Sequence, residues 1–152
     1  MPSIKVTPDL NLFYEVTDFA EPWREHETIL LLHGNAENGT AWYGWMPELT
    51  RDYRVVRPDM RGFGRSTPMP RDHAWSLDRI VDDFIDLMDA LRIDKFYLVG
   101  AKVGGTMALH LAARHPSRVK TVTVLSSHLP TARLFVHPLI GAALAAVLWR
   151  LG

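Results

Sequence analysis

The sequence predicts an α/β fold with a mainly parallel sheet and helices on both faces of that sheet. Short, continuous apolar runs alternate along the chain with longer segments in which apolar residues recur at helical spacing. Continuous apolar runs are typical of strands that are buried on both faces of a parallel sheet. Right-handed crossovers between such strands place helices on both sides of the sheet.

The patterns place the individual elements. We expect antiparallel strands at residues 4–6 and 10–16, then strands at residues 28–32, 53–57, 96–99 and 119–125. Helical spacing predicts helices at residues 77–91, with Ser76 as the N-cap, and at residues 103–114. A shorter helical pattern contains Trp42, Trp45, Met46 and Leu49. The aspartates of the helix at 77–91 are interpreted as a solvated face: Asp78, Asp82, Asp83, Asp86 and Asp89.

Composition and charge exclude several classes of function. The 152 residues suffice for one domain with a core, and 17 basic residues cancel 17 acidic ones. No basic surface is indicated, so nucleic acid and anionic membrane are not expected partners. The absence of cysteine excludes disulfides and thiolate chemistry, and no metal site or cofactor is predicted. With no signal-peptide pattern at the N-terminus, we expect a cytoplasmic protein.

The most apolar segment lies near the C-terminus, at residues 134–149. A membrane span needs roughly 20 apolar residues, and this segment is shorter and interrupted by His137, Pro138 and Gly141. We therefore interpret it as part of a lid or core helix.

Three motifs follow predicted strands, at the edge where open α/β sheets bind ligands. The first begins with His33 and Gly34, where a turn can direct the backbone N–H of Asn35 into the crevice. The second spans residues 59–66. There Asp59 and Arg61 are expected to pair, while Gly62 and Gly64 permit a tight loop. We assign this second motif to architecture rather than to catalysis.

The third motif has the layout of a nucleophile elbow, a sharp turn between a strand and a helix. Gly100 and Gly104 flank position 102 two residues away on either side, and Gly105 gives further room. Lys102 occupies the position of the nucleophile. The N–H of Val103 lies at a predicted helix N-terminus, which is a natural anion site.

With these three motifs in this order, the chain resembles the α/β-hydrolase superfamily. Within it, the chain looks like the branch with 3-oxoadipate enol-lactonases, epoxide hydrolases and haloalkane dehalogenases. The resemblance implies that the backbone N–H groups of Asn35 and Val103 form an oxyanion hole. It also implies a core at residues 1–127 containing strands 1–6, and the start of a lid at residues 128–152.

The resemblance also implies elements beyond residue 152. Strands 7 and 8 and the catalytic histidine that follows strand 8 are missing from these 152 residues. His110, His115 and His128 are poor substitutes as a base, because the first two belong to the helix after the elbow and the third is interpreted as a loop histidine. We expect a further C-terminal segment or a second subunit to cover the edge of strand 6.

A lysine at the elbow leaves three chemistries open. Direct attack on an ester is disfavoured, because the resulting amide hydrolyses far more slowly than an acyl-serine. A desolvated Lys102 amine can instead form a Schiff base with a carbonyl substrate. Alternatively, a charged Lys102 binds a carboxylate beside the N–H of Val103.

The sequence therefore predicts a protein that acts on a small apolar carbonyl or ester-like compound without the usual acyl-serine cycle. The alternative is a non-catalytic protein that binds a small ligand on a hydrolase scaffold. Four aromatic residues are candidates for lining the pocket, although core packing is the stronger interpretation for each of them: Trp42, Trp45, Phe63 and Trp75.

Overall fold

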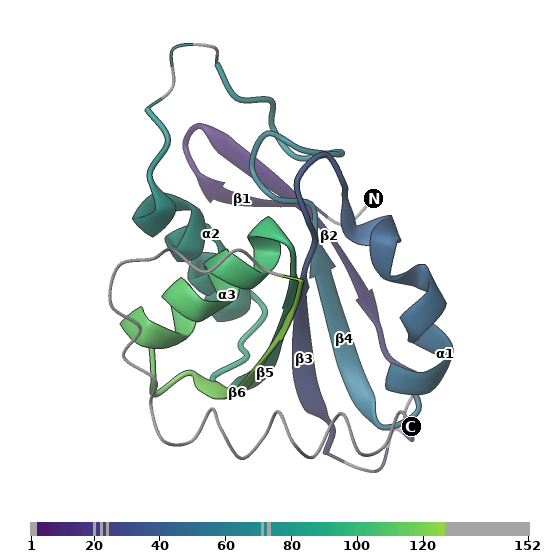
Figure 1. The fold of residues 1–152 in the computed structure, drawn as a ribbon. Coiled ribbons are helices and arrows are strands. Elements are labelled where there is room, and N and C mark those ends of the chain that lie inside the picture. Colours follow the sequence, from purple (N-terminus) through teal and green to yellow (C-terminus); the bar gives the residue numbers. More distant parts are fainter. Residues whose placement is uncertain are drawn as a thin grey trace.

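The protein is described by a computed structural model covering residues 3–19, 21, 23, 25–70, 72 and 74–126. The expected lid at residues 128–152 and His128 lie outside the described residues. Within this part of the chain, six strands form one sheet in the order β1-β2-β4-β3-β5-β6 (Figure 1).

The sheet is antiparallel at one side and parallel through its centre. The strands β1 (Ser3–Thr7) and β2 (Leu10–Thr17) form a hairpin, and β2 pairs antiparallel with β4 (Tyr53–Pro58). All remaining pairs are parallel, joining β4 to β3 (Glu27–Leu32), β3 to β5 (Phe96–Ala101) and β5 to β6 (Val119–Leu125). The predicted α/β class with a mainly parallel sheet is confirmed.

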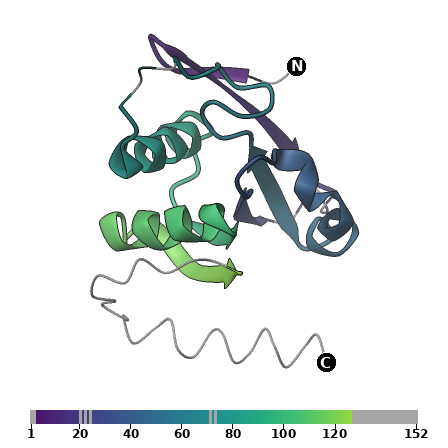
Figure 2. The ribbon, with the colours of Figure 1, turned by 45° about the horizontal axis from the view of Figure 1, so that its top comes forward.

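Helices cover both faces of the sheet, as predicted. The helices α2 (Leu77–Ala90) and α3 (Val103–Arg114) lie side by side on one face (Figures 1 and 2). On the other face lie the 3-10 helix η1 (Gly39–Trp45) and the short helix α1 (Met46–Leu49) (Figures 1 and 2).

The central strand β3 shows how the apolar runs build two cores. Leu30 and Leu32 point into the larger cluster beneath α2 and α3, whereas Ile29 and Leu31 pack in a second cluster with Trp42 of η1. Alternate residues of a strand face opposite sides, so a strand with helices on both sides must be apolar at every position. This requirement explains the unbroken run that marks β3 in the sequence.

Local signals set the ends of the longer helices. The Ser76 side chain accepts a hydrogen bond from the Arg79 N–H at 3.4 Å, which confirms the predicted N-cap of α2. Both ends of α3 lie where the sequence predicts them. The segment after β3 differs from a regular helix, because most of it is 3-10 helix before α1 begins at Met46.

The aspartates of α2 correct one prediction. Asp83 is fully buried rather than solvated, because it pairs with Arg61 from the loop after β4. Other members of the row contact basic residues elsewhere: Asp78 and Asp82 contact Arg114 of α3, and Asp89 contacts Arg118. The solvated-face prediction is therefore wrong for Asp83 alone, since Asp78, Asp82, Asp86 and Asp89 are exposed or partly exposed.

Candidate functional site

The site is built on the sharp turn between β5 and α3, where Lys102 is the tip. Lys102 has φ 54° and ψ −122°, a backbone conformation that L-residues adopt only at a cost. Its N–H donates to the Leu125 carbonyl of β6 at 2.8 Å, and its carbonyl accepts from the Gly105 N–H at 3.0 Å. These two bonds hold the strained residue between two elements.

Two glycines make this turn sterically feasible. A Cβ on Gly100 would lie 2.3 Å from the Gly104 carbonyl oxygen, and one on Gly104 would lie 2.3 Å from the Leu32 carbonyl oxygen. Real Cβ atoms do not approach oxygen so closely. The start of α3 thus packs directly against the ends of β5 and β3, as the elbow motif predicts.

The loop after β3 runs beside the elbow. Leu32 of β3 is the register partner of Gly100 of β5, so the two strands end at the same edge of the sheet. A Cβ added to Gly34 would lie 2.7 Å from Cδ of Lys102. The missing side chain at Gly34 therefore makes room for the aliphatic stem of Lys102.

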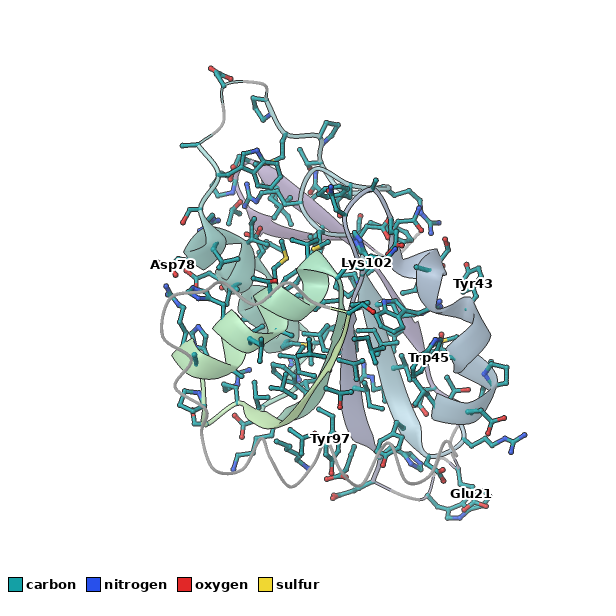
Figure 3. All side chains as sticks on the ribbon, in the orientation of Figure 1. Glu21, Tyr43, Trp45, Asp78, Tyr97 and Lys102 are labelled. Carbon is teal, nitrogen blue, oxygen red and sulfur yellow. The ribbon has the colours of Figure 1, made fainter. Side chains whose placement is uncertain are left out.

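Glu37 is the partner of Lys102. Its Oε1 pairs with the Lys102 ammonium, and its Oε2 accepts a hydrogen bond from the Gly34 N–H at 2.9 Å. The hydrogen bond from Lys102, above all, lowers the pKa of the Glu37 carboxyl below its ordinary value of 4.5. Figure 3 places Lys102 near the carboxyl ends of the central strands, at the end of the sheet opposite Tyr97.

The surroundings of Lys102 differ from those that the Schiff-base alternative requires. A Schiff-base lysine requires desolvation, but within the described part of the chain the Lys102 side chain is 58% exposed and ion-paired. This arrangement presents a cation at the tip of the elbow.

The sequence analysis missed Glu37, although the sequence offers a faint signal for it. Glu37 follows Gly34 by three residues, a spacing that lets a carboxylate in a turn accept from a preceding backbone N–H. Its contact with Lys102, 65 residues away, depends on the pairing of β3 with β5. The spacing of residues along the sequence does not reveal which strands pair.

His33 is a structural residue beneath the site. Its Nε2 accepts a hydrogen bond from the Met60 N–H at 2.9 Å, so its proton lies on Nδ1, which donates to the Gly34 carbonyl at 2.8 Å. Burial lowers the pKa of the imidazole below 6.5. A neutral His33 thus ties the loop after β3 to the loop after β4.

Asp59 organises the second motif by bonding backbone amides. Its Oδ1 accepts from the Gly39 N–H and its Oδ2 from the Arg65 N–H, both at 2.8 Å. A Cβ on Gly64, which has φ 53°, would lie 2.1 Å from Asp59 Oδ2, and Gly62 also has a positive φ. The interpretation of this motif as architecture thus agrees with its contacts.

The predicted pair between Asp59 and Arg61 is wrong. Arg61 turns away from Asp59 and donates to Asp83 of α2 and, at 3.1 Å, to Asp9 in the turn between β1 and β2. The N–H groups of Gly39 and Arg65 already satisfy both carboxylate oxygens of Asp59, so the guanidinium finds acidic partners on other elements. Asp59 was the predicted partner because it lies two residues from Arg61 in the sequence, but the fold brings Asp83 and Asp9 closer to the guanidinium.

The two amides expected for an oxyanion hole lie at the same edge of the sheet. Asn35 is exposed in the loop after β3, and Val103 is the first residue of α3. The N–H groups in the first turn of a helix have no partner within the helix. The oxyanion-hole role of these two amides stays a prediction.

The histidines of α3 lie away from Lys102, on the part of the helix that contacts α2. His110 Nε2 is 2.5 Å from Asp78, and His115 Nε2 is 3.6 Å from Asp82. The His110 ring thus contacts an acidic residue of α2, whereas the buried Nε2 of His115 makes no hydrogen bond within the described residues. That neither histidine serves as the base of the elbow stays a prediction.

The candidate aromatic residues divide between core and surface. Trp42 is buried, and Phe63 packs edge-on against the ring of His33 at 5.8 Å between centroids. Trp45 and Trp75 are 41% and 58% exposed, so the core interpretation is wrong for these two.

Within the part of the chain that the structure describes, no group of three or more His, Asp or Glu side chains is arranged to hold a metal ion. The helices from residue 39 to residue 114 also include none with the length and apolar character required to cross a membrane.

A mainly parallel sheet in which β5 ends at a strained residue that is followed at once by a helix is typical of the α/β-hydrolase class of proteins. Comparison with known proteins agrees. Residues 27–144 match the family model described as alpha/beta hydrolase fold, and the chain therefore belongs to this family.

Two of the similar proteins are named as hydrolases of small molecules. The chain is similar to 2-hydroxymuconate semialdehyde hydrolase of Pseudomonas sp. (strain CF600), with 42% identity over 65% of this chain and 36% of the relative. It is also similar to 2-hydroxy-6-oxo-2,4-heptadienoate hydrolase of Pseudomonas putida, with 37% identity over 65% of this chain and 37% of that protein. The matched part thus spans little more than a third of these relatives.

Solved structures share the fold. The enol-lactonase of Burkholderia xenovorans LB400 superposes with a TM-score of 0.72 and 28% identity, covering 80% of this chain and 45% of the lactonase. A meta-cleavage product hydrolase of Pseudomonas fluorescens IP01 gives a TM-score of 0.67 with 33% identity, over 80% of this chain and 43% of the hydrolase.

Proposed function

We propose that this chain forms the elbow side of a ligand site in an α/β-hydrolase-fold enzyme that acts on a small carbonyl compound bearing a carboxylate. In this proposal Lys102 stays charged and binds the carboxylate, and it does not replace serine as a nucleophile. The reaction then proceeds without an acyl-serine intermediate.

The observation that carries the proposal is the ion pair between Lys102 and Glu37 at the elbow tip. A Schiff-base lysine works in a desolvated pocket, whereas the Lys102 side chain is 58% exposed and its ammonium already pairs with a carboxylate. The Glu37 carboxylate also supports the view that a negatively charged oxygen fits at this position. Binding of an anion is therefore better supported than Schiff-base formation.

The substrate class is suggested by the names of the relatives. The two curated relatives are named for an unsaturated semialdehyde of muconate and for a 6-oxo-heptadienoate. Both names describe a carbonyl group and a carboxylate in one small molecule. We extend that class to this chain, with the carboxylate assigned to Lys102.

The carbonyl end of the ligand requires donors for a developing oxyanion. We assign this role to the backbone N–H groups of Asn35 and Val103, which follow β3 and β5 at one edge of the sheet. A donor of this type contributes roughly 3–4 kcal/mol to the stabilisation of the transition state. We also propose that the protein is cytoplasmic and that a further segment of the chain, or a second subunit, covers the unpaired edge of β6.

The second candidate is a non-catalytic binding protein that uses the same cation. The observation in its favour is that Lys102, at the position of the nucleophile, is already neutralised by Glu37. The two candidates predict the same ligand class and differ only in turnover.

The test uses the full-length protein with two probes. Calorimetry with 2-oxopentanoate measures carboxylate binding, and chromatography with 2-hydroxy-6-oxohepta-2,4-dienoate detects hydrolysis. We expect Lys102→Gln to weaken 2-oxopentanoate binding at least about tenfold, as the loss of a charged hydrogen bond implies. Product formation by the wild type favours the enzyme, and binding without product favours the second candidate.

A labelling control separates the cation from the Schiff base. Borohydride reduction with a small aldehyde at neutral pH is expected to leave Lys102 unlabelled. Stoichiometric labelling of Lys102, or binding of 2-oxopentanoate that is unchanged in Lys102→Gln, would contradict the proposal.

A further inference from the structure

We propose that Glu37 is an internal competitor for the ligand carboxylate: its side chain fills the anion position at Lys102 when no ligand is bound and is displaced when a ligand carboxylate enters. The inference rests on the proposed function, in which Lys102 binds a carboxylate. It adds a residue that lowers the affinity of that site for carboxylates.

The first argument is the geometry of the Glu37 carboxylate. Its two oxygens are used separately, Oε2 by the Gly34 N–H at 2.9 Å and Oε1 by the Lys102 ammonium. The two donors come from the ends of neighbouring parallel strands, β3 and β5. A carboxylate on a small molecule has the same two oxygens and can satisfy the same two donors.

The second argument is the accessibility of the pair. The side chains of Glu37 and Lys102 are 29% and 58% exposed in the described structure. Ion pairs with this degree of exposure contribute little net free energy, because water and salt screen them. An arriving carboxylate therefore displaces Glu37 at low cost, whereas a buried pair such as Arg61 with Asp83 resists exchange.

The third argument excludes a different role for Glu37. A general base works best when its pKa lies near the working pH, but the contact with Lys102 lowers the pKa of Glu37 below 4.5. Glu37 is thus a weak base and a persistent anion at neutral pH. Both properties suit a competitor for an anion site.

Competition has a consequence for selectivity. A neutral ligand that enters the site leaves the charge of Lys102 uncompensated if it displaces Glu37, so only an anionic ligand replaces what it removes. Lys102 therefore selects carboxylates over the corresponding amides, while competition from Glu37 weakens the binding of carboxylates and leaves that of amides, which do not displace it, unchanged.

The experiment measures binding of 2-oxopentanoate to the full-length protein by titration calorimetry at neutral pH. Glu37→Gln keeps the size of the side chain and an acceptor for the Gly34 N–H but removes the charge. We expect it to bind 2-oxopentanoate about two- to tenfold more tightly than the wild type. Binding of the neutral 2-oxopentanamide is expected to stay within about twofold.

Matched variants isolate the effect. Glu48→Gln removes a carboxylate of α1 whose partner is Arg51, and it is expected to bind like the wild type. In the Lys102→Gln background, Glu37→Gln is expected to give no further gain. Glu37→Ala, which removes the acceptor as well, serves as the second variant if Glu37→Gln does not fold.

The outcomes separate this inference from the proposed function. If Lys102→Gln weakens binding but Glu37→Gln binds equally or less tightly than the wild type, Glu37 orients the lysine and the competitor is overturned while the function stands. The competitor role is also overturned if Glu37→Gln tightens binding of 2-oxopentanoate in the Lys102→Gln background. Binding that does not depend on Lys102 rejects the proposed function itself.

Discussion

Arg61 and Asp83 form a buried, bidentate ion pair in which Nε and Nη2 of the guanidinium each donate to one carboxylate oxygen at 2.7 Å. The two side chains are 3% and 1% exposed. The pair fastens the loop after β4 to α2, and its bonds to Asp83 raise the pKa of Arg61 above its ordinary value. The loop after β4, which His33 links to the loop after β3, is thus anchored to α2.

Neutralising Asp83 is expected to destabilise the fold strongly. Asp83→Asn leaves the Arg61 charge buried beside an amide, and breaking one side of a buried pair costs about 3 kcal/mol or more. Asp82→Asn is the control, because Asp82 is 38% exposed and its pair with Arg114 contributes less than about 1 kcal/mol. Urea unfolding measures both, and equal midpoints for the two variants would refute the expectation.

Filling the space beside Gly104 is expected to disrupt the start of α3. A methyl group there meets the backbone carbonyl oxygens of Leu32 and His33 at 2.3 and 2.4 Å. Overpacking against backbone that cannot move aside costs about 3 kcal/mol. Gly44→Ala in η1 is the matched control, since a Cβ at Gly44 has no neighbour within 4 Å. The prediction fails if the unfolding midpoints of both alanine variants lie at the same denaturant concentration as that of the wild type.

The backbone strain at Lys102 is measurable by comparing two truncations. Lys102→Ala and Lys102→Gly both delete the contact with Glu37, but only glycine adopts φ 54° without steric cost. We expect Lys102→Gly to be about 1–2 kcal/mol more stable than Lys102→Ala. Denaturant titration of the two proteins decides this, and an alanine variant of equal or greater stability would indicate a relaxed turn.

His33 is expected to make stability depend on pH between neutral and mildly acidic conditions. Burial holds the pKa of folded His33 below 6.5, so the unfolded chain takes up its proton at a higher pH than the folded chain. The stabilisation is therefore complete above pH 6.5 and declines as the pH falls, by at most about 1.4 kcal/mol per pH unit.

The measurement is the free energy of unfolding at several pH values. His33→Gln is expected to be less stable at pH above 6.5 but to lose less stability on acidification than the wild type. His110→Gln, which removes an exposed ring that contacts Asp78, keeps the His33 dependence. If the free energy of unfolding of His33→Gln fell with decreasing pH as steeply as that of the wild type, the pH dependence would not come from His33.

Much of the fold followed from the order of residues, because its signals are local. The Ser76 cap and the apolar stripe of α2 operate within a few turns, and the ends of β6 and α3 agree with the predicted ones. The elbow was recognised for the same reason, since Gly100 and Gly104 lie two residues either side of Lys102.

The sequence by itself determined the α/β class, the family and the position of Lys102 at the elbow, all of which depend on periodicity and short spacings. Only the tertiary structure decided the partners of charged groups: Glu37 for Lys102, and Asp83 rather than Asp59 for Arg61. A charge interacts with whatever the fold brings within a few ångströms, and strand pairing brings together residues that are distant in the chain. For this reason the sequence indicated a lysine at the elbow, whereas the structure gave it the environment of an ion-paired cation.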